Sequence, residues 1–160
     1  MSGVKFWSIA VLGSLGCSIL QLALAQRFQL AGFAPDWTLL FLSLVCQIST
    51  REQGAVSGFF VGLTYGAAAG ANLMHYVISR TVAAFVASWL RVFGIEPSPV
   101  TAGVQAGLLV LFAQLMLMFL APPTELLPYI GVTIRTALAN GGLAMLVFWA
   151  LRRFIGPHER

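Results

Sequence analysis

Two arginines, Arg80 and Arg135, stand inside long apolar stretches of the sequence. An arginine at the centre of a membrane helix costs about 2.5 to 3.5 kcal/mol, so neither side chain is expected to face lipid. Asn72, Tyr76 and Arg80 follow a spacing of four residues, which places them on one helix face. A polar cavity that opens outward and suits an anionic group is one interpretation. Its candidate residues are Asp36, Asn72, Tyr76, Arg80 and Arg135.

The alternative for the two arginines is structural. Asp36 and Glu125 are acidic residues expected near the same side of the membrane, so they are candidate partners for two buried ion pairs. Such ion pairs would fix the positions of the helices and would not bind a ligand. The sequence leaves both interpretations open.

The sequence contains few residues that could form a catalytic site. The sequence contains no G-x-S-x-G, no H-E-x-x-H and no P-loop, and its five acidic residues lie near the ends of apolar runs. Cys17 and Cys46 lie in apolar runs as free thiols, and His75 has no Cys, His or carboxylate three or four residues away. We therefore expect no enzyme, no metal site and no cofactor.

The composition indicates a membrane protein. Of 160 residues, 59% are hydrophobic and 9% are charged, and the mean hydropathy is +0.89. A soluble domain carries about 25% charged residues, which excludes an ordinary water-soluble fold. The net charge of +4 is spread singly between apolar blocks, a distribution that favours membrane orientation over nucleic-acid binding.

The apolar runs predict one all-α transmembrane domain over residues 1–160. A spanning helix needs about 20 apolar residues. The uncharged run at 53–79 is too long for one helix and divides around Gly70, Ala71 and Asn72. With the runs at 6–26 and 97–124, the run after Pro35 and the run from Tyr129 to Leu151, this gives six helices. We place them at 6–25, 33–50, 54–71, 73–93, 100–120 and 129–151.

The charges predict the orientation of these helices. With both termini cytoplasmic, the outer loops hold only Arg27, and the inner side holds the remaining loop and tail cations. These are Lys5, Arg51, Arg91, Arg152, Arg153 and Arg160. Residues 23–25 also form an A-x-A pattern that resembles a signal-peptide cleavage site. Cleavage there would invert the charge balance, so we expect the first helix to be retained.

Glycine recurs at every fourth residue of the third expected helix, at Gly54, Gly58, Gly62, Gly66 and Gly70. Helices in a bilayer associate through close packing, and glycine lets a neighbouring backbone approach. The stripe therefore predicts a helix-packing interface. The sequence favours a partner helix of the same chain and leaves an intermolecular contact open. Gly103 and Gly107 repeat the spacing in the fifth helix.

Several short motifs resemble a known family. They are Pro35-Asp36 followed by Leu39-Leu40, an inner turn with Arg51, the segment Gly58-Phe59-x-x-Gly62-Leu63, and an outer turn with Leu73 and His75. Together they resemble MreD, the rod shape-determining membrane protein of bacteria. The family often has Asp after Gly-Leu-x-x, where this chain has Gly66.

The resemblance implies a non-catalytic, multi-pass protein of the inner membrane that acts in the elongasome, the machinery that inserts peptidoglycan during rod growth. It implies binding to MreC and connections to MreB and to the RodA glycosyltransferase and its transpeptidase. It also implies a compact bundle similar to the S-components of energy-coupling-factor transporters. The alternative function is such an S-component, which would capture a vitamin or a metal. A structural subunit of an unrelated membrane complex is a third possibility.

Overall fold

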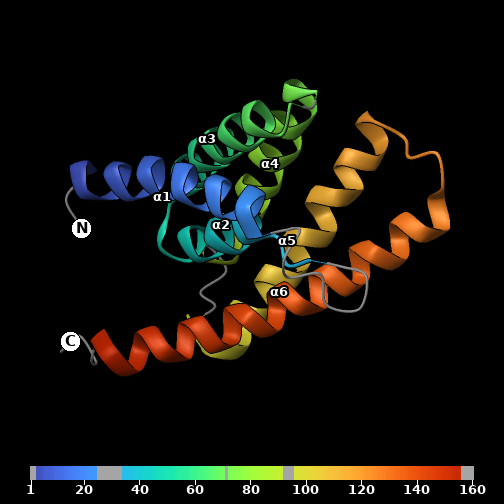
Figure 1. Ribbon diagram of the computed structural model, residues 1–160. Helices are drawn as coiled ribbons and strands as arrows, with labels where there is room; N and C mark the ends of the chain where they lie inside the picture. Colours follow the sequence, from blue (N-terminus) through green and yellow to red (C-terminus); the bar gives the residue numbers. More distant parts are fainter. Residues whose placement is uncertain (1–2, 25–33, 71, 92–95, 156–160) are drawn as a thin grey trace.

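The structure is a computed structural model that describes residues 3–24, 34–70, 72–91 and 96–155. These residues form six α-helices and one short 3-10 helix, shown in Figure 1. The helices are α1 (Gly3–Leu24), α2 (Trp37–Ile48), α3 (Arg51–Ala69), α4 (Leu73–Ala87), α5 (Pro99–Leu120) and α6 (Leu126–Ile155), with the 3-10 helix η1 (Ser88–Arg91) after α4.

The second helix is shorter than expected, because capping residues limit it. Asp36 stands before α2 in an extended conformation and accepts a hydrogen bond from Leu39 N–H. After Ile48 the backbone is extended at Ser49, and Thr50 forms a capping box with Gln53 that begins α3. The expected span of 33–50 is thus reduced to twelve helical residues. Ser49, which ends α2, and Thr50, which caps α3, therefore form a short break between the two helices.

Other helix ends also differ from the sequence expectation. The α-helical part of α4 ends at Ala87, and the chain continues to Arg91 as η1. Helix α6 begins at Leu126, before the expected start at Tyr129, and Pro128 lies in its first turn, where a missing N–H is tolerated. It continues to Ile155, beyond the expected end at residue 151. The expected ends at residues 25, 33, 71 and 93 lie outside the described residues.

Within the part of the chain that the structure describes, three helices are long and apolar enough to cross a membrane, over Val4–Leu24, Pro99–Leu120 and Leu126–Arg153. Helices α2 and α4 are apolar but have 12 and 15 residues, which correspond to about 18 and 22 Å, below the ~30 Å of a bilayer core. Helix α3 has 19 residues and begins with the polar sequence Arg-Glu-Gln. The count of six spanning helices therefore stays a prediction.

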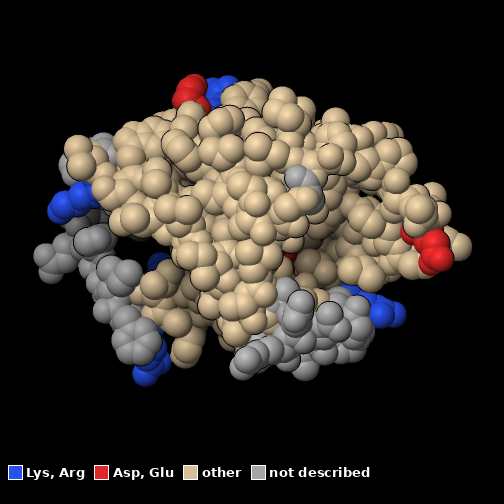
Figure 2. All heavy atoms as spheres, turned by 45° about the horizontal axis from the view of Figure 1, so that its top comes forward, with Lys and Arg blue, Asp and Glu red and all other residues tan. Residues whose placement is uncertain are grey.

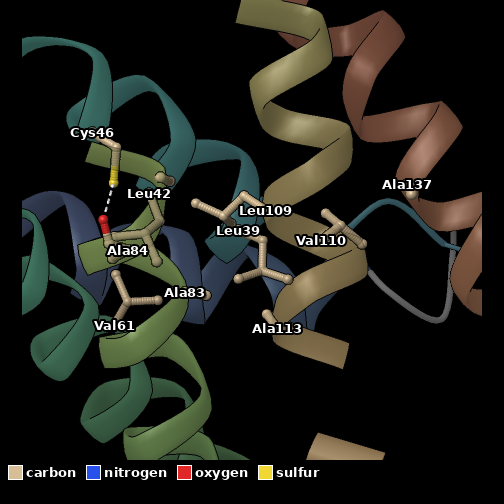
Figure 3. Packing of buried hydrophobic residues seen from close by; sticks show 11 residues of the cluster. Leu39, Leu42, Cys46, Val61, Ala83, Ala84, Leu109, Val110, Ala113 and Ala137 are labelled. Carbon is tan, nitrogen blue, oxygen red and sulfur yellow. Dashed lines mark hydrogen bonds between the residues drawn. The ribbon is translucent and has the colours of Figure 1, made fainter. Parts of the chain in front are cut away.

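Helix α2 is the centre of the bundle. It contacts all five other α-helices, and eight of its twelve residues are buried. Leu39, Leu42 and Cys46 pack against side chains of α3, α4 and α5 (Figure 3). By contrast, α1, α5 and α6 expose many large apolar side chains, and on the face shown in Figure 2 the few charged side chains lie mostly near the margins. This arrangement suits a bundle surrounded by lipid.

Candidate functional site

The carboxylate of Asp36 is buried at the start of α2 and has both oxygens engaged. Its Oδ1 accepts hydrogen bonds from Leu39 N–H at 2.9 Å and from the Thr38 hydroxyl at 2.6 Å. Its Oδ2 lies 3.2 Å from Nη2 of Arg80 on α4. A helix N-terminus favours negative charge, so the cap and the ion pair stabilise the same ionised group.

Arg80 is almost completely buried, with a relative exposure of 2%. Besides Asp36, its guanidinium meets two aromatic rings: Tyr65 of α3 at 4.7 Å and Tyr76 of α4 at 4.9 Å, measured from Cζ to the ring centroids. These rings pack edge to face with 5.2 Å between centroids. A cation over an aromatic face gains more when water is excluded. One carboxylate and two ring faces therefore compensate a charge that lipid cannot solvate.

Amide side chains of α1 and α6 form hydrogen bonds with the backbone at the start of α2. Asn140 of α6 accepts a hydrogen bond from Asp36 N–H at 3.0 Å and donates one to the Asp36 carbonyl at 2.8 Å. Gln21 of α1 accepts a hydrogen bond from Trp37 N–H at 2.7 Å, one of the N–H groups that a helix start leaves unpaired. Side chains of α1, α3, α4 and α6 thus converge on the first residues of α2. We call Gln21, Asp36, Tyr65, Tyr76, Arg80 and Asn140 the polar cluster.

Close packing of α3 against α4 brings Tyr65 to Arg80. A Cβ added at Gly58 would collide with the Arg80 carbonyl oxygen, and one at Gly62 would lie 2.6 Å from Val77 Cα. Gly54 faces Ser88 at similarly short range, and a Cβ at Gly66 would lie 3.0 Å from Leu73 Cδ1. These four glycines therefore meet α4 or η1 of the same chain. Gly70 instead ends α3 in a left-handed conformation, with φ of 62°.

Comparison with known families decides what kind of protein carries this site. The family model for the rod shape-determining protein MreD matches residues 4–155, nearly the whole chain. The chain belongs to the MreD family. It is therefore a rod shape-determining membrane protein, and its family is part of the MreBCD shape system. Searches of curated proteins and of solved structures gave no match.

The motifs that resemble the MreD family have physical roles in this fold. Pro35-Asp36 forms the capped start of α2 and half of the ion pair. Gly58 and Gly62 are the positions where the backbone of α4 approaches α3. The family resemblance thus falls on the residues that join α2, α3 and α4. The MreD family is a structural one and is not known for catalysis, in keeping with a site in which the charged groups bind each other.

The structure brings together three of the five residues predicted to line a polar cavity, namely Asp36, Tyr76 and Arg80. The other two, Asn72 and Arg135, are exposed. On α6 the buried positions are Thr136, Ala137, Asn140 and Ala144, so the side chain of Arg135 turns away from the polar cluster. Glu125 is exposed as well. The outward polar cavity stays a prediction, and the buried ion pair forms at Arg80.

Sequence reasoning overlooked Gln21, Thr38 and Tyr65 as members of this site. Gln21 had a recognisable signal, because it is an amide side chain inside the first uncharged run, and a polar side chain in a membrane helix is expected to find a partner. Thr38 lies two residues after Asp36, near the helix start where capping residues are common. Tyr65 had no such signal, since its position depends on how closely α3 and α4 pack.

Proposed function

We propose that this chain is a non-catalytic membrane scaffold of the bacterial elongation machinery in the inner membrane. It binds MreC and helps to connect MreB with the RodA glycosyltransferase and its transpeptidase during peptidoglycan synthesis. The observation that carries the proposal is the MreD family match over residues 4–155. The polar cluster supports it, because Asp36 and Arg80 are engaged with each other and hold helices together.

The proposed topology has six spans with both termini in the cytoplasm. Two arginine–tryptophan contacts support the inner boundary: Arg51 lies 4.7 Å from the Trp89 ring, and Arg153 lies 5.7 Å from the Trp149 ring. Tryptophan and arginine are typical of the membrane–water interface. Both contacts fall at helix ends that the charge rule assigns to the inner side. In this topology α2, with eight of its twelve residues buried, lies among longer helices that replace lipid around it. Helix α4 is continued by η1 to Arg91.

An S-component of a vitamin transporter is the second candidate function. A cavity of about 700 Å³ between α4, α5 and α6 favours it, because ligand pockets typically measure about 300 to 1,000 Å³. Its polar side chains are Gln105, Tyr129 and Thr133, fewer than a water-soluble vitamin with many polar groups would need. The described residues contain no group of three metal-binding side chains, so a vitamin is the better substrate for this alternative than a metal.

Depletion in the native bacterium separates the two functions. For the scaffold, we expect rod-shaped cells to widen and become round as the protein is lost, and tagged protein to co-purify with MreC from solubilised membranes. A variant at an exposed apolar site, Leu138→Ala, is the control and should restore both shape and recovery. Unchanged cell shape together with loss of vitamin uptake would overturn the scaffold proposal and support the transporter.

A further inference from the structure

The cavity between α4, α5 and α6 extends along the helices. Helix α4 contributes Ala83, Val86 and Ala87 to its lining, and α5 contributes a row from Gln105 to Met118. At 1.5 Å per residue, that row extends about 20 Å along the helix axis. Helix α6 contributes Tyr129, Ile130, Thr133 and Ile134. The cavity is therefore elongated parallel to the helices.

The uneven packing of α5 and α6 explains why space remains here. At one end of the pair the helices touch through glycine: a Cβ on Gly103 would lie 2.9 Å from the Gly141 carbonyl oxygen. At Gly107 the corresponding distance, to the Ala137 carbonyl oxygen, is 3.4 Å. Towards the connection at residues 121–125 the two helices diverge (Figure 1). Close packing at one end and divergence at the other produce a crevice.

The crevice offers almost no binding capacity to a polar ligand. Eleven of its fourteen lining residues are apolar, and none is charged. Two of the three polar ones already donate to the protein itself: Gln105 Nε2 donates to the Ala87 carbonyl at 3.2 Å, and the Tyr129 hydroxyl donates to the Gln114 carbonyl at 2.8 Å. Water gains little in an apolar space of this kind. The lining therefore suits hydrocarbon.

The crevice is continuous with the surface that faces the bilayer. Leu108 on its edge is 54% exposed, Ile134 is 48% exposed, and Leu111, Leu115 and Ile130 are exposed beside them. A partner helix is about 10 to 12 Å thick, so a space of this volume holds only about one to two of its turns. One leaflet contributes about 15 Å of the ~30 Å hydrocarbon core. The length of the crevice therefore suits a single hydrocarbon chain.

We propose that this crevice binds one acyl chain of a bilayer phospholipid, which lies along α5 and enters at the end of the α5–α6 pair. Tyr129 stands at that end, where tyrosine is common at a membrane interface. The bound acyl chain fills the space between the diverging ends of α5 and α6, and it packs against Ala83 and Ala87 of α4. The proposal requires that the protein lies in a lipid bilayer, and it does not require the scaffold function.

Photochemical labelling tests the proposal. The full chain is placed in nanodiscs of phosphatidylglycerol and phosphatidylethanolamine that contain a phospholipid with a diazirine in its acyl chain, and labelled peptides are mapped after irradiation. We expect labels to concentrate several-fold on the crevice residues of α5 and α6 over the exposed face of α1. Thr133→Trp fills the crevice and should reduce that labelling several-fold. Leu138→Trp, on an exposed face of α6 outside the lining, should leave it unchanged.

Three outcomes would overturn the proposal. Equal labelling of the crevice and of the exposed face of α1 would indicate ordinary boundary lipid. Unchanged labelling in folded Thr133→Trp would place the acyl chain elsewhere, and Leu108→Trp at the crevice edge provides the same test if the first variant fails to fold. Loss of crevice labelling in native membranes, with its persistence in nanodiscs, would show that a protein partner fills the space.

Discussion

Asn140 on α6 forms two hydrogen bonds with the backbone of Asp36, 104 positions earlier in the chain: its Oδ1 accepts from the Asp36 N–H, and its Nδ2 donates to the Asp36 carbonyl. One side chain thus binds both backbone groups of the residue that forms the ion pair with Arg80, and it is the partner of the Asp36 N–H. Unpaired backbone groups are costly away from water. Helix α6 therefore fixes the start of α2 and, through it, the position of the ion pair.

Replacing Asn140 by Leu should destabilise the protein, because it leaves the Asp36 N–H without its partner in a buried setting. A buried donor left unsatisfied costs about 1 to 3 kcal/mol. The measurement is the thermal unfolding of purified protein in detergent. Leu138→Ala is the matched control, since Leu138 lies two residues away on the exposed side of the same helix. Equal stability of the two variants would show that the hydrogen bonds of Asn140 contribute nothing to the free energy of unfolding.

Neutralising either member of the ion pair should destabilise more than neutralising both. Arg80→Met leaves the Asp36 carboxylate without its counter-ion, and Asp36→Asn leaves the guanidinium without its counter-ion. Breaking a buried pair costs about 3 to 5 kcal/mol, whereas replacing both members is often much less harmful. The measurement is a double-mutant cycle of unfolding free energies. Strictly additive effects would mean that the two charges do not interact.

Arg135→Gln is the matched control for Arg80, because its side chain is exposed. We expect this variant to keep most of its stability, whereas the Arg80 variant loses several kcal/mol. Equal losses at both positions would contradict the different environments of the two arginines. The sequence alone does not distinguish the two arginines, since both lie at similar depth within apolar runs.

Local signals in the sequence predict much of the fold. Uncharged apolar runs predict the helices, and the Pro35-Asp36 pair marks the start of α2. The spacing of Gly58 and Gly62 predicts a close helix contact, which in this structure is made by α4. These features depend on neighbouring residues, so a single sequence carries them.

The arrangement of the site depends on residues far apart in the chain and was harder to predict. Helix α6 is apolar on most of its surface, so periodicity does not indicate that Asn140 faces inward and Arg135 outward. Gln21 and Tyr65 reach the polar cluster only because α1 and α3 pack beside α2 and α4. Such relationships follow from tertiary packing.

The aromatic rings around Arg80 should contribute to stability separately from Asp36. Tyr65→Leu removes a ring that lies 4.7 Å from the guanidinium, and a desolvated cation over a ring gains about 2 kcal/mol. Tyr65→Phe keeps the ring and should retain most of the stability. Unfolding measurements on both variants check this expectation. A loss in Tyr65→Phe as large as in Tyr65→Leu would assign the effect to the hydroxyl group.

Gly62→Leu should prevent normal packing of α3 on α4 and abolish the rod-shape function. A Cβ at this position would lie 2.6 Å from Val77 Cα and 2.7 Å from the Tyr76 carbonyl oxygen. These are backbone atoms of the adjoining helix, so neither can move aside as a flexible side chain would. The helices would separate, and Tyr65 would lose its contact with Arg80. The measurements are protein abundance in membranes and cell width in a depleted strain that expresses the variant.

Gly131→Ala is the matched control for the glycine stripe. No atom outside its own helix lies within 4 Å of a Cβ at Gly131, and alanine within a helix is favoured over glycine by about 1 kcal/mol. We therefore expect normal abundance, normal cell width and unchanged or slightly higher stability for this variant. Normal abundance and rod shape in Gly62→Leu would contradict the packing argument, because the only remaining explanation would be that α3 and α4 tolerate separation.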